Sequence, residues 1–336
     1  GIPGGLLSGA LFQYPGLLMM SLAGLGAAEV LIDPADWLRG LSAGLSAGGV
    51  ALVVDACIGL CKKICVDDDT MGLCLVSACV AFYCSAHATA FTAWILPLLL
   101  LIGGCTTRYT RRNKELPPAD EKHVSTFGLS FTSGCLLIGF WAAILLLVIV
   151  ARDQTTYDDW KYLHIFETFF RIGSIIFGGG QVVLPLLQNE VEDWITDEQF
   201  YAGLGLVQAM PGPLFNLSAY LGAIAGGVAG IPVAWLGLFG PGVMLIFGVL
   251  PVWGWFRNFR TYKLALPGLN SSAVGLVVAA CFGMAIKVWK ISPFPSATVV
   301  IGMITFSAVH LYKQQAPLTI AGGGILGIIA WAVGVF

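Results

Sequence analysis

Long apolar segments without a single charge constrain this sequence more than any other feature. The stretch 127–150, for example, contains no Asp, Glu, Lys or Arg. An α-helix needs about 20 such residues to cross the hydrocarbon core of a bilayer. Over the whole chain 57% of the residues are hydrophobic and 11% are charged, whereas a soluble domain has about a quarter charged residues. Because the apolar segments are continuous and do not alternate with a period of two, we predict an all-α polytopic membrane protein and exclude a membrane barrel.

We expect the membrane helices to differ in length. The apolar segment 71–104 suits two short spans that turn near Ser85, since one crossing needs only about 20 residues. A capping box of Thr196 and Gln199 begins a helix that ends near Met210, and its length of about 21 Å is too short to span the core. The other predicted helices cover residues 1–28 with an interruption at Pro15-Gly16, 37–61, 127–150, 162–177, 184–194, 214–228, 232–251, 264–289, 295–312 and 317–336.

Two groups of helix-breaking residues interrupt the apolar sequence in the second half of the chain. They are Phe177-Gly178-Gly179-Gly180-Gln181, followed by Pro185, and Gln208-Ala209-Met210-Pro211-Gly212-Pro213. Inside a helix, Gly costs ~1 kcal/mol and Pro ~3 kcal/mol relative to Ala. Broken helix at membrane depth is tolerated where it is buried in protein or lines a watery cavity. We therefore predict that these two breaks frame a site that binds an anion.

The predicted site relies on helix N-termini, whose free N–H groups and partial positive charge attract anions. Asn216 and Ser218, in the first turns of the helix after the second break, could add side-chain donors. Other interpretations stay open: the glycines could serve close helix packing, the second break could be a tight turn, and Arg171 could pair with Glu167 at i, i+4. The candidate binding residues are Arg171, Gly178, Gly179, Gly180, Gln181, Gln208, Pro211, Gly212, Pro213, Asn216 and Ser218.

Ionisable residues within or beside the spans are candidates for coupling to a proton gradient. We name Glu167, Glu190 and Asp55, although the favoured alternative for Asp55 is snorkelling toward the span end at Lys62-Lys63. We assign no role to the four scattered histidines, which are His87, His123, His164 and His310. The nine cysteines include no CxxC pair, so we predict free thiols and neither a metal site nor a cofactor.

The polar segment 106–126 predicts the organisation of the chain. It holds five Lys and Arg residues beside membrane spans, which favours a cytoplasmic linker between two halves. The sequences 51–59 (ALVVDACIG) and 275–283 (GLVVAACFG) match, and internal repeats of helices are typical of transporters. We therefore expect residues 1–104 to be the C-terminal part of a first repeat that is truncated at its N-terminus, 105–126 the linker, and 127–336 a complete second repeat.

The motifs of the second half resemble those of one known family. Their order and spacing, over about 45 residues, are similar to the chromate ion transporter (CHR) family, whose long members contain two halves with the same two breaks. The motifs that carry this resemblance are Phe170-Arg171-Ile172-Gly173, Phe177-Gly178-Gly179-Gly180 with Pro185, Trp194-Ile195-Thr196, Gln199-Phe200 and Leu206-Val207-Gln208-Ala209-Met210-Pro211-Gly212-Pro213.

The resemblance implies secondary transport of a tetrahedral oxyanion, chromate with sulfate as its structural analogue. It implies efflux that confers resistance and that is coupled to an ion gradient, and we expect the protein in the plasma membrane. The alternatives are a passive anion channel, or a half-transporter that needs a separate first repeat. No HExxH motif and no pair of intramembrane acids at catalytic spacing is present, so we predict that the chain is not an enzyme, and no nucleic-acid motif is present. The expected partners are the oxyanion and the lipid bilayer, and a homodimer is compatible with the sequence.

Overall fold

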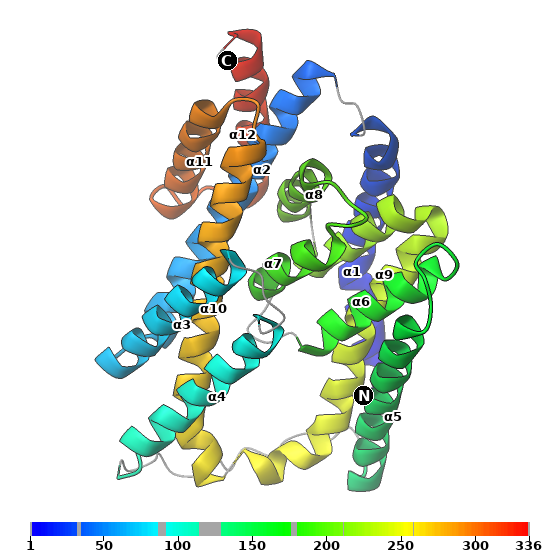
Figure 1. Ribbon diagram of the computed structural model, residues 1–336, viewed down its shortest axis with the longest axis vertical. Helices are drawn as coiled ribbons and strands as arrows, with labels where there is room; N and C mark the ends of the chain where they lie inside the picture. The colour runs from blue at the N-terminus through cyan, green and yellow to red at the C-terminus, as the bar shows by residue number, and fades with distance from the viewer. Residues whose placement is uncertain are drawn as a thin grey trace.

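The computed structural model describes residues 2–31, 35–86, 92–113, 129–175, 180–210, 212–257 and 259–334. Within these ranges the regular structure is entirely helical, which confirms the predicted all-α class (Figure 1). The helices are α1 (Ile2–Val30), α2 (Asp36–Ile64), α3 (Asp68–Ala86), α4 (Thr92–Thr110), α5 (Phe131–Asp153), α6 (Lys161–Ile175), α7 (Gly180–Val191), α8 (Asp197–Ala209), η1 (Leu214–Asn216), α9 (Leu217–Phe256), α10 (Arg260–Ile291), α11 (Pro295–His310) and α12 (Ala316–Ala332).

Several of these helices have the length and composition of membrane spans. In the described part of the chain five helical stretches qualify: Pro3–Val30, Asp36–Ile64, Phe131–Asp153, Leu214–Trp253 and Arg260–Ile291. The helices α11 and α12 are apolar but shorter. Large hydrophobic side chains such as Leu136, Phe140 and Leu147 of α5 are exposed, as suits a surface in contact with lipid. The chain is therefore an integral membrane protein.

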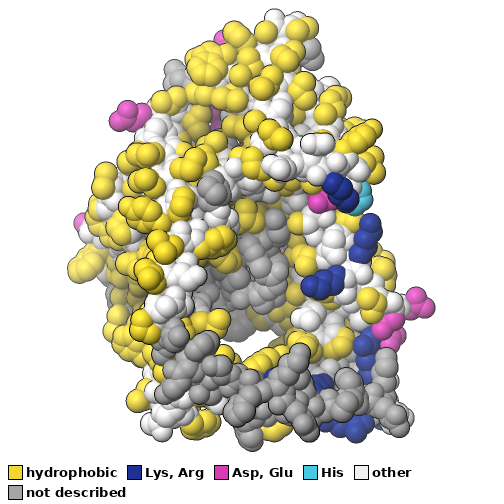
Figure 2. All heavy atoms as spheres, turned by 180° about the vertical axis from the view of Figure 1, so that it is seen from behind, with side chains coloured by type: hydrophobic (Ala, Val, Ile, Leu, Met, Phe, Trp, Pro, Cys, Tyr) yellow, Lys and Arg dark blue, Asp and Glu magenta, His cyan; other side chains and the backbone are white. Residues whose placement is uncertain are grey.

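The helices form two groups, with α7 and α8 between them (Figure 1). In the first group α1, α5 and α6 pack against α9. In the second group α2 packs against α11 and α12, α10 packs against α3 and α4, and α2 contacts α10. Phe169 of α6, Tyr201 of α8 and Tyr220 of α9 are fully buried in the largest hydrophobic cluster, which joins both groups. Figure 2 shows a hollow between the groups, with Lys and Arg side chains along one flank.

Glycines allow the helices of the second group to cross at very short distance. A Cβ atom on Gly323 of α12 would lie 3.0 Å from the carbonyl oxygen of Gly44 in α2. A Cβ atom on Gly103 of α4 would lie 2.6 Å from the carbonyl oxygen of Gly268 in α10. Without side chains the backbones approach closely and gain dispersion contacts, as small residues permit in membrane proteins. Each long helix of this group is thereby fixed to a pair of helices from the other half of the chain.

The short elements of the second half lie where the sequence predicted them. Thr196 Oγ1 accepts a hydrogen bond from Gln199 N at 3.2 Å, and Gln199 Oε1 accepts one from Thr196 N at 3.0 Å, so α8 begins with the predicted capping box. The backbone of α9 breaks at Gly227, whose φ of 63° favours glycine. This break confirms a short helix after the second motif, predicted to end near residue 228.

One local prediction is wrong and another holds only in part. The expected interruption at Pro15-Gly16 is absent, because α1 continues through Pro15, which removes a single backbone donor and can be accommodated within a long helix. The acidic run Asp67-Asp68-Asp69 also suggests a solvated turn; its side chains are exposed, but only Asp67 lies outside a helix. Asp68 and Asp69 form the first turn of α3, where the helix dipole favours acidic side chains, and Asp67 Oδ1 accepts a hydrogen bond from Thr70 N at 3.0 Å.

Candidate functional site

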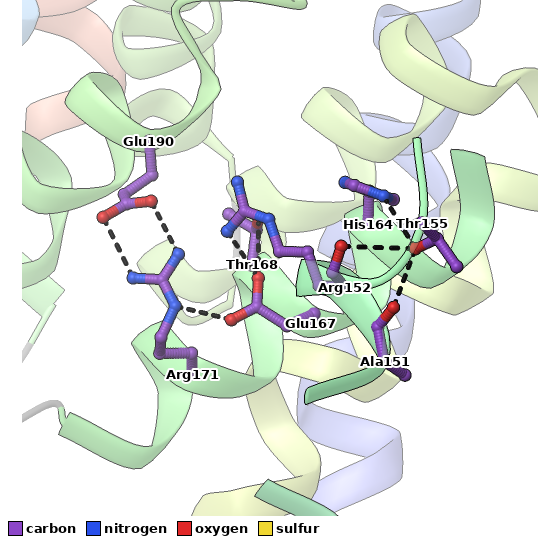
Figure 3. Close-up of polar contacts among 8 residues, drawn as sticks. All are labelled: Ala151, Arg152, Thr155, His164, Glu167, Thr168, Arg171 and Glu190. Atoms are coloured by element: carbon purple, nitrogen blue, oxygen red, sulfur yellow. Dashed lines mark hydrogen bonds and ion pairs between the residues drawn. The ribbon is translucent and has the colours of Figure 1, made fainter. Parts of the chain in front are cut away.

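A cluster of two arginines and two glutamates lies where α5, α6 and α7 meet (Figure 3). At its centre is Glu167 of α6, whose side chain is 1% exposed. Glu167 Oε2 accepts a hydrogen bond from Arg152 Nη1 at 2.6 Å, and Glu167 Oε1 accepts one from Arg171 Nε at 2.6 Å. The i, i+4 pair that the sequence offered as one interpretation of Arg171 is therefore present, and a second arginine joins it.

Arg171 also connects α6 to α7. Its Nη1 and Nη2 atoms donate to Glu190 Oε1 and Oε2 at 3.0 and 2.7 Å, which is the two-pronged contact that a planar guanidinium makes with a carboxylate. All three guanidinium nitrogens of Arg171 thus contact carboxylate oxygens. With two arginines and two glutamates the cluster is electrically neutral, and Arg171 binds no further anion while both carboxylates stay in place.

Glu190 is the more accessible carboxylate of the two that hold Arg171. Its side chain is 28% exposed, and α7 is not one of the helices long enough to span a membrane. Burial alone would raise the pKa of Glu190, but hydrogen bonds and charge from Arg171, together with the charge of Arg152, hold that pKa below its ordinary value. Water and protons therefore reach Glu190 more readily than Glu167.

Sequence reasoning missed Arg152. The residue lies in the last turn of α5, directly after a long apolar span, where a basic residue usually marks only the end of the span. The available signal was that Arg152 comes just before the turn into α6, and α6 carries the charged pair Glu167 and Arg171. The turn between these helices is held by Thr155, whose Oγ1 bonds to Ala151 O at 2.8 Å and lies 3.2 Å from His164 Nε2.

The residues predicted around the second break lie together, but their side-chain donors are occupied. Asn216 Nδ2 donates to the carbonyl oxygen of Gln13 at 3.1 Å, and Ser218 Oγ donates to the carbonyl oxygen of Phe215 at 2.8 Å. Gly212 has a φ of 117°, which favours glycine, and Pro213 precedes η1. Because the donors already bind carbonyl oxygens, anion binding at this break would rest on backbone N–H groups.

Two buried acceptor atoms at this break have no hydrogen-bond partner within the described part of the chain. They are Asn216 Oδ1 and Gln13 Oε1. Gln208, just before the break, donates from Nε2 to the carbonyl oxygen of Gly49 at 2.6 Å and ties α8 to α2. Of the glycine break, Gly180 begins α7, and the side chain of Gln181 is not described. The predicted residues Gly178, Gly179 and Pro211 lie outside the described residues.

Asp55 lies apart from the arginine cluster, on α2. Its Oδ1 atom is 2.6 Å from His310 Nδ1 at the end of α11, and the His310 ring stacks on Phe306. The favoured alternative of snorkelling toward Lys62-Lys63 stays a prediction, and the side-chain contact of Asp55 comes from a histidine 255 residues away. No periodic pattern in the sequence relates these two positions, so this partner was not predicted.

Comparison with known proteins agrees with the resemblance seen in the motifs. A family model described as "Chromate transporter" matches residues 1–107 and 163–328. The "Chromate transport protein" of Cupriavidus metallidurans is 23% identical over 98% of this chain and 76% of its own length. The protein of the same description from Pseudomonas aeruginosa is 26% identical over 96% of this chain and 74% of its own length.

A cyanobacterial relative gives the same result. The "Probable chromate transport protein" of Synechococcus elongatus is 23% identical over 99% of this chain and 78% of its own length. No solved structure matches the chain. The class is that of a transporter and not of an enzyme, as the sequence predicted. Because the family model covers most of the residues, the protein belongs to the chromate transporter family.

Proposed function

We propose that this chain carries chromate across the membrane, and that the oxyanion binds Arg171 by taking the place of Glu190. The observation that supports the proposal is the two-pronged contact between Arg171 and the more exposed of its two carboxylates. A tetrahedral oxyanion presents a pair of oxygens to Nη1 and Nη2 much as a carboxylate does. Glu167 stays on Nε during this exchange, because it is buried and is also held by Arg152.

The same exchange would couple transport to protons. Protonation of Glu190 removes the negative charge that Arg171 contacts, which frees Arg171 for the oxyanion. An oxyanion bound to Arg171 in turn favours protonation of Glu190, because Glu190 has lost its positive partner. Each ligand therefore strengthens the binding of the other, as linkage requires. Without oxyanion, the lowered pKa keeps Glu190 charged and bound to Arg171, so that protons do not cross alone.

Efflux through the plasma membrane is the direction that we propose. A dianion that moves with one proton carries one net negative charge, and an inside-negative potential drives that charge outward by about 2.3 kcal/mol per 100 mV. We also propose that Gly178 and Gly179 belong to the site. Sulfate is a proposed second substrate. We propose that the linker 105–126 lies in the cytoplasm.

Flux measurements in proteoliposomes of the purified chain test this mechanism. We expect Arg171→Gln to abolish chromate flux, and Glu190→Gln to transport without the dependence on an imposed pH gradient. The matched control is Arg111→Gln, which removes the arginine of a separate ion pair with Asp67. Normal chromate flux in the Arg171→Gln variant would refute the proposal.

The same vesicles separate the two alternative functions. A passive channel would keep its chromate flux after an ionophore collapses the pH gradient, whereas the chromate flux of the proposed transporter would fall. A half-transporter would carry no chromate as a purified chain and would regain flux only when a second chain supplies the missing repeat.

A further inference from the structure

Arg152 has binding capacity that the cluster does not use. Its side chain is 34% exposed, and within the described residues its guanidinium contacts only Glu167, through Nη1. An arginine carries five N–H donors, so most of those of Arg152 are not engaged by described residues. Figure 3 shows the guanidinium groups of Arg152 and Arg171 converging on Glu167 from different helices.

The charge of Arg152 acts on the position that the oxyanion would occupy. It is one of the charges that lower the pKa of Glu190, whose carboxylate holds the Nη1 and Nη2 atoms of Arg171. The charge balance points the same way. Once Glu190 is protonated, the two arginines and Glu167 leave one net positive charge, and without Arg152 they would leave none.

We propose that Arg152 determines specificity for doubly charged oxyanions by supplying the second positive charge of the site. This inference rests on the proposed function, in which the oxyanion replaces Glu190 on Arg171. Because a Coulomb interaction scales with the charge of the ligand, loss of Arg152 weakens the binding of a dianion twice as much, in free energy, as that of a monoanion. In terms of binding constants, the fold-loss for a dianion is the square of that for a monoanion.

Competition with chromate uptake measures this effect in proteoliposomes at one fixed pH. The two probes are sulfate, a tetrahedral dianion, and perchlorate, a tetrahedral monoanion. A loss of ~1.4 kcal/mol per ligand charge is tenfold in affinity for a monoanion and a hundredfold for a dianion. For Arg152→Gln we therefore expect half-inhibition to need about tenfold more perchlorate and about a hundredfold more sulfate.

Two further variants separate a charge role of Arg152 from a purely geometric role. Arg152→Lys keeps the charge and should keep the sulfate-to-perchlorate ratio within about threefold of the wild type, and Arg111→Gln should leave it unchanged. If Arg152→Gln does not fold, Arg152→Lys decides alone, because a purely geometric role would lower its affinity for both anions equally. Equal fold-losses for sulfate and perchlorate, with chromate uptake retained, would overturn this inference only. Absence of chromate uptake by the wild type would overturn the proposed function and this inference together.

Discussion

Replacing Glu167 with Gln should destabilise the fold more than any other single loss of charge in the arginine cluster. Glu167 is 1% exposed and accepts hydrogen bonds from both arginines at 2.6 Å. A hydrogen bond to a charged group contributes about 1.5–3 kcal/mol, and the bond from Arg152 lies at the low end because that side chain is 34% exposed. The glutamine keeps one acceptor oxygen but turns an amide donor toward the other arginine. We expect a loss of about 3 kcal/mol, consistent with breaking a buried ion pair.

This loss corresponds to a fall in Tm of about 6 °C, taking about 2 °C per kcal/mol for a chain of this size. The measurement is thermal unfolding in detergent with a thiol-reactive dye, which reports the exposure of buried cysteines such as Cys57, Cys74 and Cys281. All variants are compared at one heating rate, since unfolding of a membrane protein is often irreversible.

The comparison variant is Glu190→Gln. Glu190 is 28% exposed and, among the described residues, forms its ion pair with Arg171 alone, so its replacement should lower Tm by only about 2 °C. If Glu190→Gln lowers Tm as much as Glu167→Gln, burial does not set the strength of these contacts, and the reasoning fails.

Three further predictions concern other parts of the fold. Gly44→Val should greatly reduce the yield of folded protein, because a side chain would collide with the backbone at Gly323, whereas Gly59→Val, at a position with open space, should fold normally. Thr196→Ala should cost about 1 kcal/mol through loss of the capping box, and Thr196→Ser should restore the Tm. Asp55→Asn and His310→Gln should each lower Tm by ~2 °C, and the double variant should lose no more than either, which a thermal double-mutant cycle checks; additive losses would show that the pair is not coupled.

Local rules of sequence account for much of the second half of the chain. The capping box at Thr196 and the i, i+4 spacing of Glu167 and Arg171 are contacts within one helical turn, so they follow from sequence alone. The break at Gly227 likewise lies within a residue of the predicted end of its helix, since glycine adopts a positive φ that other residues avoid.

Contacts between distant elements could not be predicted in this way. Arg152 reaches Glu167 across a turn between two helices, and His310 reaches Asp55 over 255 residues. Which faces of two helices meet depends on the packing of the whole bundle, and no local spacing records it. The placement of the anion site at the two breaks, the internal repeat and the division at 105–126 stay predictions.

The glycine crossing between α2 and α12 has a consequence for biosynthesis. α2 is made before the helices that cover its small-residue face, α11 and α12, which follow it only after α3 to α10. Until α11 and α12 are synthesised, α2 lies in the bilayer without these packing partners. In that state it can pair with the wrong helices or be degraded by quality-control proteases. Removal of α11 and α12 should therefore leave α2 misfolded, although α2 lies far from them in the sequence.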